Sequence, residues 1–340
     1  MRTSKNEIMT NIRAKCFGLI LLTFLIFAAA FGQEKSRIAF TINEPTLIPE
    51  GIAYDARTKI FYVGSTYLRK IISIDENGAA KDFTSEAQDG LRGVLGMRVD
   101  EKRRVLWAIS SDGGLAMPLK NGGRDCIGCS EVFKYNLETG KLIKKYSLKN
   151  EPEKHFLNDL VVRSNGDVYL TDTLRGAIYY ISATGGEMTE FSNFGKTSYP
   201  NGIDLSADEK RLFVALDGKI AAIDLRNKKS LYLAVPPNVK VGGIDGLYFY
   251  KNSLLAVQPD DAGKTIVRYF LNEKQTAVVK AGIIESSHKL LNQPTTGTIV
   301  GKDFYYLANS QLQLFRSIFQ ADGSFDKSKL SEVFVLKLKI

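Results

Sequence analysis

The sequence repeats one two-strand pattern six times, at intervals of 43 to 63 residues. Each copy begins with an apolar segment such as PEGIAYD or PNGIDLS, passes through a polar turn, and ends in a second apolar run such as IFYVG or LFVAL. One position is equivalent in all six copies and is occupied by Glu50, Leu95, Asn158, Asn201, Asp245 and Thr296. After Thr296, 44 residues remain, enough for one more unit. Repeats of this length, with several short strands each, are typical of a β-propeller.

Two further strand-like runs follow in each unit, for example KIISIDENG with AKDFTS and EVFKYNLETG with KLIKKYSL. The runs are rich in Val, Ile, Tyr and Phe, their turns carry Asn-Gly or Thr-Gly, and no stretch keeps a 3.6-residue apolar period. We therefore expect an all-β fold, a six-bladed β-propeller of four-stranded antiparallel blades. The runs at 37–42 and 332–340 should be neighbours in the last blade, in an order that the sequence leaves open.

The first 32 residues have the features of a secretory signal peptide. Four basic residues precede the apolar run CFGLILLTFLIFAAAF at 16–31, and small residues and a polar segment follow it. The alternative is an uncleaved membrane anchor, but the run is shorter than the ~20 apolar residues of a comfortable span. We expect removal of 1–32, a single propeller domain over 33–340, and export to the periplasm or the cell exterior. No stable membrane span should remain after cleavage.

Charge argues against nucleic acid as a partner. Removing the first 32 residues takes away four basic residues and one acidic residue, which lowers the net charge from +9 to +6. The remaining basic residues form no run and no nucleic-acid-binding motif. We expect a monomer whose partner is a small-molecule substrate or ligand.

The interval between Leu95 and Asn158 contains a glycine-rich insertion at about 110–130, which could cover one mouth of the central channel. It carries Cys126 and Cys129 in the motif CIGC. In an exported protein, a local disulfide is the first interpretation. Half of a zinc site is the alternative, which is disfavoured because the chain has no second cysteine pair and only two histidines.

Four of the six equivalent positions carry oxygen-donor side chains, namely Glu50, Asn158, Asn201 and Asp245. Equivalent positions of successive blades surround one channel, so these side chains should converge although they lie far apart in the sequence. Taken singly, an Asn or Asp before Gly is an ordinary turn residue, and only the shared register favours a site. Two carboxylates with two amide oxygens suit a hard divalent cation, and Ca²⁺ tolerates irregular geometry better than Mg²⁺.

These motifs resemble those of a known family. PEG at 49–51, ND at 158–159, PNGIDLSAD at 200–208 and IDG at 244–246 are similar to the senescence marker protein/gluconolactonase (regucalcin-like) family of six-bladed propellers. Paraoxonases and strictosidine-synthase-like proteins share that architecture. The resemblance covers 37–340 and implies a channel Ca²⁺, or another divalent cation, held by the four residues named above. It also implies that Asp159 contributes to a second metal site.

The resemblance further implies hydrolysis of a lactone or related ester, with the metal polarising the carbonyl group and Asp245 as the candidate general base. Metal binding lowers the basicity of a carboxylate, which opposes this role. Candidate substrate contacts are His155, Arg92 and Gln258, and His288 is expected to be exposed. The family's sugar-contacting residues cannot be placed in this sequence, so the identity of the substrate does not transfer.

A non-catalytic propeller that binds a ligand or a protein around a structural calcium is the alternative function, because fold does not determine function. A base and a polar substrate-binding wall beside the metal would distinguish the hydrolase. A base is available as Asp245, whereas the sequence does not reveal the wall. A condensing enzyme similar to strictosidine synthase would need a catalytic glutamate that this sequence does not identify.

Overall fold

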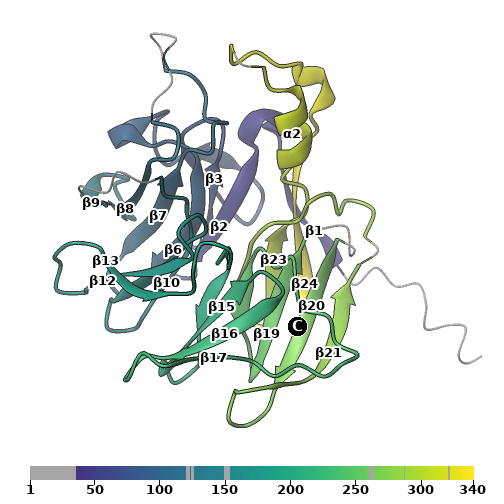
Figure 1. Cartoon of the computed structure of the whole chain (residues 1–340). Helices are drawn as coiled ribbons and strands as arrows, with labels where there is room; N and C mark the ends of the chain where they lie inside the picture. Colours follow the sequence, from purple (N-terminus) through teal and green to yellow (C-terminus); the bar gives the residue numbers. More distant parts are fainter. Residues whose placement is uncertain are drawn as a thin grey trace, which may run out of the picture. The chain divides into compact units, whose positions relative to one another are not determined.

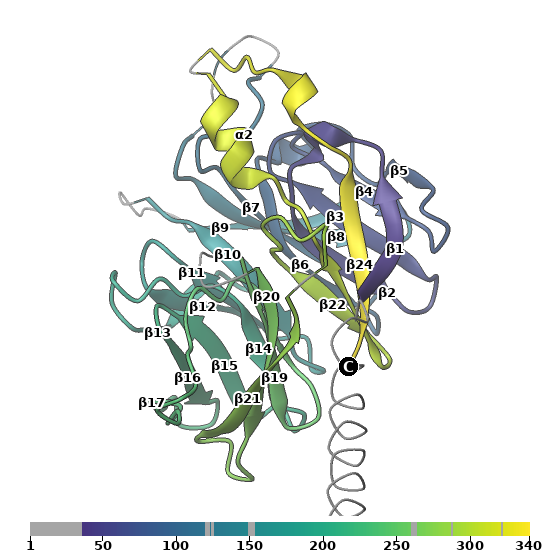
Figure 2. The same cartoon turned by 90° about the vertical axis from the view of Figure 1, so that its right-hand side faces the viewer.

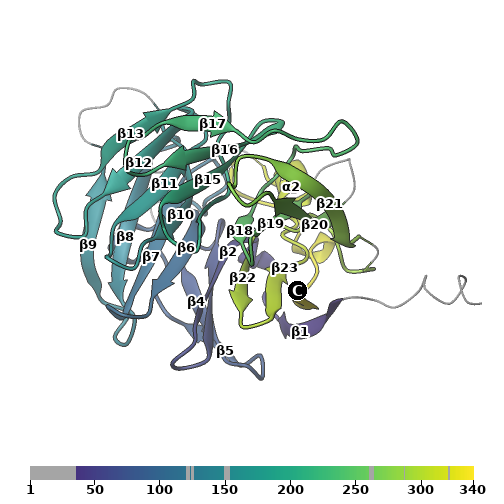
Figure 3. The same cartoon turned by 90° about the horizontal axis from the view of Figure 1, so that it is seen from below.

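The computed structural model describes residues 36–119, 123, 126–148, 154–259, 264–286, 288–320 and 322–340. Within these ranges the chain forms six four-stranded antiparallel sheets, which confirms the predicted six-bladed propeller (Figure 1). Viewed from below, the first strands of the sheets gather at the centre and the later strands lie further out (Figure 3). The predicted signal peptide, residues 1–32, lies outside the described residues.

The first five blades are each built from four consecutive strands, in order from the channel outward. Blade one contains β2 (Pro49–Asp55), β3 (Ile60–Ser65), β4 (Ile71–Ile74) and β5 (Ala80–Asp82). Blade two contains β6 (Val94–Asp100), β7 (Val105–Ser111), β8 (Ser130–Asn136) and β9 (Leu142–Ser147). Blade three contains β10 (Leu157–Val162), β11 (Val168–Asp172), β12 (Ala177–Ile181) and β13 (Thr189–Asn193). Blade four contains β14 (Ile203–Leu205), β15 (Arg211–Leu216), β16 (Lys219–Asp224) and β17 (Ser230–Tyr232).

Blade five contains β18 (Leu247–Phe249), β19 (Ser253–Gln258), β20 (Thr265–Leu271) and β21 (Val278–Glu285). Blade six contains β22 (Gly297–Val300), β23 (Asp303–Leu307), β24 (Val333–Lys339) and β1 (Ser36–Ile42). The described residues include one α-helix, α2 (Leu312–Ile318), and 3₁₀ turns at Pro45–Leu47, Gln88–Gly90 and Lys327–Lys329. Helix is therefore as scarce as predicted, and no described helix is long and apolar enough to cross a membrane.

The ring is closed by strands from opposite ends of the chain. β24 pairs with β23 on one side and with β1 on the other, so the N-terminal strand is the outermost strand of blade six. The pairing runs from Ser36 opposite Leu338 to Ile42 opposite Val333. The prediction that 37–42 and 332–340 are neighbours is confirmed, and the structure supplies their order. The Ser36 backbone N–H also donates to Glu285 Oε2 (2.9 Å), which ties β1 to blade five.

The hydrophobic core is divided among the contacts between neighbouring blades. Trp107 of blade two and Tyr179 of blade three, for example, belong to one buried cluster. Equivalent clusters join each of the other neighbouring pairs, including blades six and one. Because apolar burial contributes about 25 cal/mol per Å² removed from water, each sheet depends on both neighbours for its stability.

The innermost strands approach one another closely. The residue after each equivalent position is glycine in five blades, at Gly51, Gly96, Gly202, Gly246 and Gly297. A Cβ on Gly51 would lie 1.9 Å from the Leu95 carbonyl oxygen, and one on Gly202 would lie 2.4 Å from the Leu247 backbone nitrogen. The backbone of the next strand therefore occupies the space of a side chain. Blade three is the exception, because Asp159 stands at this position.

The two ends of the channel differ in the loops around them. At one end, short turns such as 56–59 and 101–104 join the first two strands of each blade. The other end, which we call the mouth, carries the equivalent positions and the long connections. Two of these connections are the blade-two insertion at 112–129 and the blade-six insertion at 308–332, which contains α2. The helix projects from this end of the propeller (Figure 2).

Candidate metal centre at the channel mouth

The structure places the four predicted ligands at the mouth of the channel. Glu50 is the second residue of β2, and Asn158 is the second residue of β10. Asn201 and Asp245 each lie two residues before an innermost strand, β14 and β18. Glu50 and Asn158 are buried, whereas Asn201 and Asp245 are partly exposed. The Asn201 side chain lies beside the Asp245 carboxyl group, and Asp245 in turn lies close enough to Glu50 for their charges to interact.

Hydrogen bonds orient the Asn158 amide. Its Nδ2 donates to Thr173 Oγ1 (3.0 Å), and Thr173 Oγ1 donates to the Pro200 carbonyl oxygen (2.7 Å). Because Thr173 uses its only proton on Pro200, it must accept a proton from Asn158, so the amide nitrogen faces Thr173. The Asn158 amide oxygen is then the atom available to a ligand in the channel. The same bonds tie Asn158 to the residue that precedes Asn201.

The two carboxyl groups lie in surroundings that disfavour their charge. Burial, and then the negative charge of Asp245, raise the pKa of Glu50 to about 8, against an opposing effect of Arg316. Burial raises the pKa of Asp245 to about 6, although the neighbouring Asn201 side chain opposes the shift. Loss of water around a negative charge is the main cause in both cases. A divalent cation between the two groups would offset both charges and favour their ionised forms.

The donor set fits a hard divalent cation. Two carboxylates and two amide oxygens are ligands that Ca²⁺ prefers, and water can complete the coordination. Within the described ranges, no three or more His, Cys, Asp and Glu side chains are grouped so that they could hold a metal. The amide oxygens of Asn158 and Asn201 are therefore an essential part of the candidate site.

A second layer of polar side chains lies deeper in the channel. Arg98, Asp204 and Tyr248 each lie three residues beyond an equivalent position on their innermost strands. Arg98 Nη2 lies 3.5 Å from Asp159 Oδ2, and its guanidinium carbon lies 5.3 Å from the centre of the Tyr248 ring. Burial raises the pKa of Asp159, and raises that of Asp204 to about 6, with Arg98 opposing both shifts. The carboxylate predicted to bind a second ion thus already has a guanidinium beside it.

His155 is buried in the loop before β10. Its Nδ1 lies 2.5 Å from Asp172 Oδ2 at the end of β11, and its ring lies edge-on to Tyr179. The carboxylate thus fixes the imidazole, and a substrate contact by His155 stays a prediction. The expectation that His288 is exposed is wrong. The connection after blade five folds into a turn, in which the Leu291 N–H donates to the His288 carbonyl oxygen (2.9 Å).

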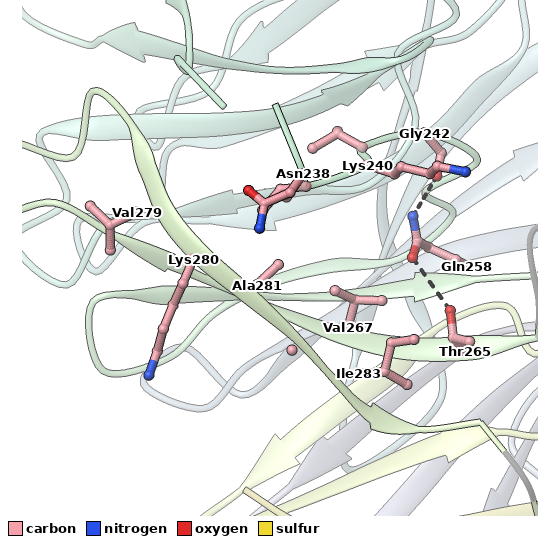
Figure 4. Close-up of a pocket in the computed structure, with 13 residues that line it drawn as sticks. Asn238, Lys240, Gly242, Gln258, Thr265, Val267, Val279, Lys280, Ala281 and Ile283 are labelled. Carbon is pink, nitrogen blue, oxygen red and sulfur yellow. Dashed lines mark hydrogen bonds between the residues drawn. The ribbon is translucent and has the colours of Figure 1, made fainter. Parts of the chain in front are cut away.

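Arg92 and Gln258 are each held by neighbouring side chains or backbone. Arg92 Nη1 pairs with Glu131 Oε2 at 2.7 Å. Gln258 lines a groove of about 550 Å³ in blade five, where its Nε2 donates to the Gly242 carbonyl oxygen (2.6 Å) and its Oε1 accepts from Thr265 (3.4 Å) (Figure 4). Both predicted substrate contacts therefore have structural partners, and neither has a demonstrated link to the four ligands.

Cys126 and Cys129 are joined by a disulfide, with their Cα atoms 5.3 Å apart. The disulfide lies in the last part of the blade-two insertion, directly before β8. Backbone hydrogen bonds tie this turn to Asp112 (2.9 Å) and to His155 (3.0 Å), through Gly128 in both cases. The turn therefore packs beside the loop that carries His155.

Sequence reasoning missed the blade-six insertion. Its Phe315 is fully buried in an apolar cluster with Ile48 and Tyr67, which the blade-two residues Leu115 and Met117 also join. The two insertions therefore meet at the mouth. A sequence signal existed. Because the N-terminal run was a candidate fourth strand of the last blade, the 44 residues after Thr296 were too many for three strands alone.

No protein-family model and no curated protein matches the chain. Solved structures do match it. The gluconolactonase of Xanthomonas campestris is 14% identical with a TM-score of 0.55, over 85% of this chain and 86% of that one. The allergen Mala s 1 of Malassezia sympodialis is 12% identical with a TM-score of 0.62, over 90% and 96%. The chain shares the fold of these solved structures. Virginiamycin B lyase of Staphylococcus aureus shares it too, at 14% identity and a TM-score of 0.57, over 90% of this chain and 99% of that one. At such identities the likeness shows the fold alone.

Proposed function

We propose that this propeller is an exported, divalent-metal-dependent hydrolase of a lactone or a related ester. The proposal rests on the placement of two carboxylates and two amides, from four different blades, at one mouth of the channel. The likeness to a propeller described as a gluconolactonase supports the reaction class. The features of residues 1–32 support export.

In this proposal Glu50, Asn158, Asn201 and Asp245 hold the ion. When bound, Ca²⁺ or another divalent cation supplies polarisation of the substrate carbonyl group. Asp245 accepts the proton of the water that attacks the carbonyl carbon. The bond from that carbon to the leaving oxygen then breaks, the leaving oxygen takes up the proton, and a lactone becomes a hydroxy acid.

The surroundings of Asp245 bear on its suitability as a base. A bound cation lowers the pKa of a carboxyl group, which weakens it as a base. Burial acts in the opposite direction and raises the pKa of Asp245 to about 6 without metal. Burial therefore offsets part of the basicity lost on metal binding.

One observation favours the alternative, a non-catalytic propeller with a structural calcium. His155, Arg92 and Gln258, the predicted substrate contacts, all have partners within the protein. Side chains held in this way stabilise loops as readily as they bind a ligand.

The test combines metal binding with an activity screen. Metal-free protein is titrated with Ca²⁺ by calorimetry, and a panel of lactones and aryl esters is assayed with and without EDTA. The hydrolase predicts Ca²⁺ binding and activity that EDTA abolishes and Ca²⁺ restores. Binding without any hydrolysis would favour the structural calcium. Failure to bind any divalent cation at millimolar concentration would contradict both functions.

A further inference from the structure

Arg316 stands at the mouth on the side of Glu50. It follows Phe315 in α2, and the Phe315 ring packs 5.0 Å from that of Tyr67 in a cluster that includes Ile48, two residues before Glu50. Arg316 is also the cation whose charge acts most strongly on Glu50. The helix, packed against the segment of Ile48, thus carries a positive charge close enough to act on Glu50.

The blade-six insertion is held firmly at its base. The Gln311 side chain accepts from the Ser331 N–H (2.8 Å) and donates to the Ser331 carbonyl oxygen (2.9 Å). Asn309 similarly accepts from the Phe334 N–H (2.7 Å) and donates to the Glu332 carbonyl oxygen (2.8 Å). These paired bonds close the insertion across its two ends. The position of α2 is therefore fixed by polar bonds at its base and by Phe315 in the cluster.

Arg316 itself is exposed. Across the part of the chain that the structure describes, no salt bridge or hydrogen bond engages its side chain. If a divalent cation balances Glu50 and Asp245, the positive charge of Arg316 is left at the mouth without a partner. An anionic group on the substrate can supply that partner, because a guanidinium binds a carboxylate through two parallel hydrogen bonds.

Two exposed apolar side chains lie on the segments that hold the amide ligands. Leu174 is 44% exposed and follows Thr173, the hydrogen-bond partner of Asn158. Tyr199 is 52% exposed and precedes Pro200, which accepts from the same Thr173 hydroxyl. One hydroxyl therefore joins the two segments that carry these side chains. The mouth thus carries a cation whose charge acts on Glu50, and exposed apolar side chains on the segments that hold Asn158 and Asn201.

We propose that the substrate is amphipathic, an ester or lactone with an anionic group bound by Arg316 and an apolar part against Leu174 and Tyr199. This inference rests on the proposed hydrolase function and specifies its substrate class. The reacting carbonyl group then lies between the two, at the predicted ligands. Arg316 is a substrate-binding residue in this arrangement and takes no part in proton transfer.

The test uses two matched substrates. One is the mono-p-nitrophenyl ester of a medium-chain dicarboxylic acid, with a free terminal carboxylate, and the other is the same ester capped as a methyl ester. Both are assayed with wild type, Arg316→Gln and Arg316→Lys. Lys329→Gln is the matched control, because it removes one exposed positive charge from the same insertion.

Wild type should prefer the anionic ester. Arg316→Gln should lower kcat/KM for that ester about tenfold, as expected for loss of a hydrogen bond to a charged group, and leave the capped ester within about twofold. Arg316→Lys should retain most of the preference, and added salt should weaken it, because the guanidinium is exposed. Leu174→Asn should lower kcat/KM for both esters. Equal loss on both esters in Arg316→Gln, or no preference in wild type, would overturn the proposal.

A binding measurement separates this inference from the proposed function. If wild type hydrolyses neither ester and none of the lactones and aryl esters of the panel, the hydrolase proposal fails. The free dicarboxylic acid, from which the ester is made, is then titrated into the Ca²⁺-loaded protein by calorimetry. Weaker binding to Arg316→Gln than to wild type and Lys329→Gln would still support an anion-binding site, and equal binding to all three would exclude it.

Discussion

The Asn201 side chain lies beside the Asp245 carboxyl group and favours its ionised form, although the two residues belong to different blades. This proximity is a consequence of propeller geometry, in which equivalent positions of neighbouring blades face the same channel. The candidate base and a candidate metal ligand therefore lie next to each other at the mouth of the channel.

Replacing Asp245 by Asn should separate metal binding from turnover. The amide can still bind Ca²⁺ through its oxygen, but it cannot accept the proton of the attacking water. At saturating Ca²⁺ we expect hydrolysis of any identified substrate to fall by about 10²–10⁴-fold, the usual contribution of a positioned base. Calorimetry and steady-state assays measure the two effects, and Asp208→Asn, an exposed carboxylate, is the control. Full turnover in Asp245→Asn would exclude Asp245 as the base.

Without metal, the propeller should lose stability as the pH rises. The pKa of Glu50 is about 8 in the folded protein, against an ordinary value of 4.5. Between these values the folded state keeps a proton that the unfolded state has lost, so the free energy of unfolding falls as the pH rises through the interval. Asp245 adds the same trend between its ordinary value of 3.8 and about 6. Melting temperatures measured in EDTA across this range test the prediction.

Calcium should act in the opposite direction. Carboxyl ligands must be deprotonated to bind it, so Ca²⁺ should raise the melting temperature more at the alkaline end of the range than at the acidic end. Glu50→Gln should flatten the pH dependence in EDTA. A melting temperature that rises with pH in EDTA, or a Ca²⁺ effect independent of pH, would contradict the arrangement.

Replacing Arg98 by Met should destabilise the propeller. The change leaves Asp159 and Asp204 in the channel without the cation that lowers their pKa values. We expect a loss of about 3–5 kcal/mol in the free energy of unfolding, typical of a buried charge that loses its partner. Urea denaturation measures it, with exposed Arg57→Met as the control. The double variant Arg98→Met/Asp159→Asn should recover part of the loss, and wild-type stability in the single variant would show that the pair is unimportant.

Deleting β1 should prevent closure of the ring. Without Ser36–Ile42, the whole outer edge of β24 is left unpaired, and an unpaired edge promotes aggregation. We expect loss of soluble protein from a chain that begins at Asn43. A chain that begins at Ser36 retains every β1 pairing and is the control. A soluble deletion variant with the melting temperature of the control would show that β1 is dispensable.

The shared register predicted both the blades and the four oxygen donors. It could not predict partners that depend on other positions. Arg98 and Asp159 belong to different positions of the repeat, and only the close approach of β6 and β10 brings them together. The blade-six insertion escaped notice for a related reason. Blade six takes its outermost strand from the N-terminus, so the C-terminal segment supplies only three strands. With the insertion added, this segment is as long as an ordinary four-strand repeat.

The sequence by itself determined the six-bladed fold and the equivalence of Glu50, Asn158, Asn201 and Asp245, because a repeat period and a register are properties of the chain. Only the tertiary structure decided that β1 lies outside β24, that Thr173 orients the Asn158 amide, and that Phe315 packs the helix of Arg316 against Ile48. These relationships depend on side-chain packing and hydrogen bonds between segments whose separation along the chain follows no period.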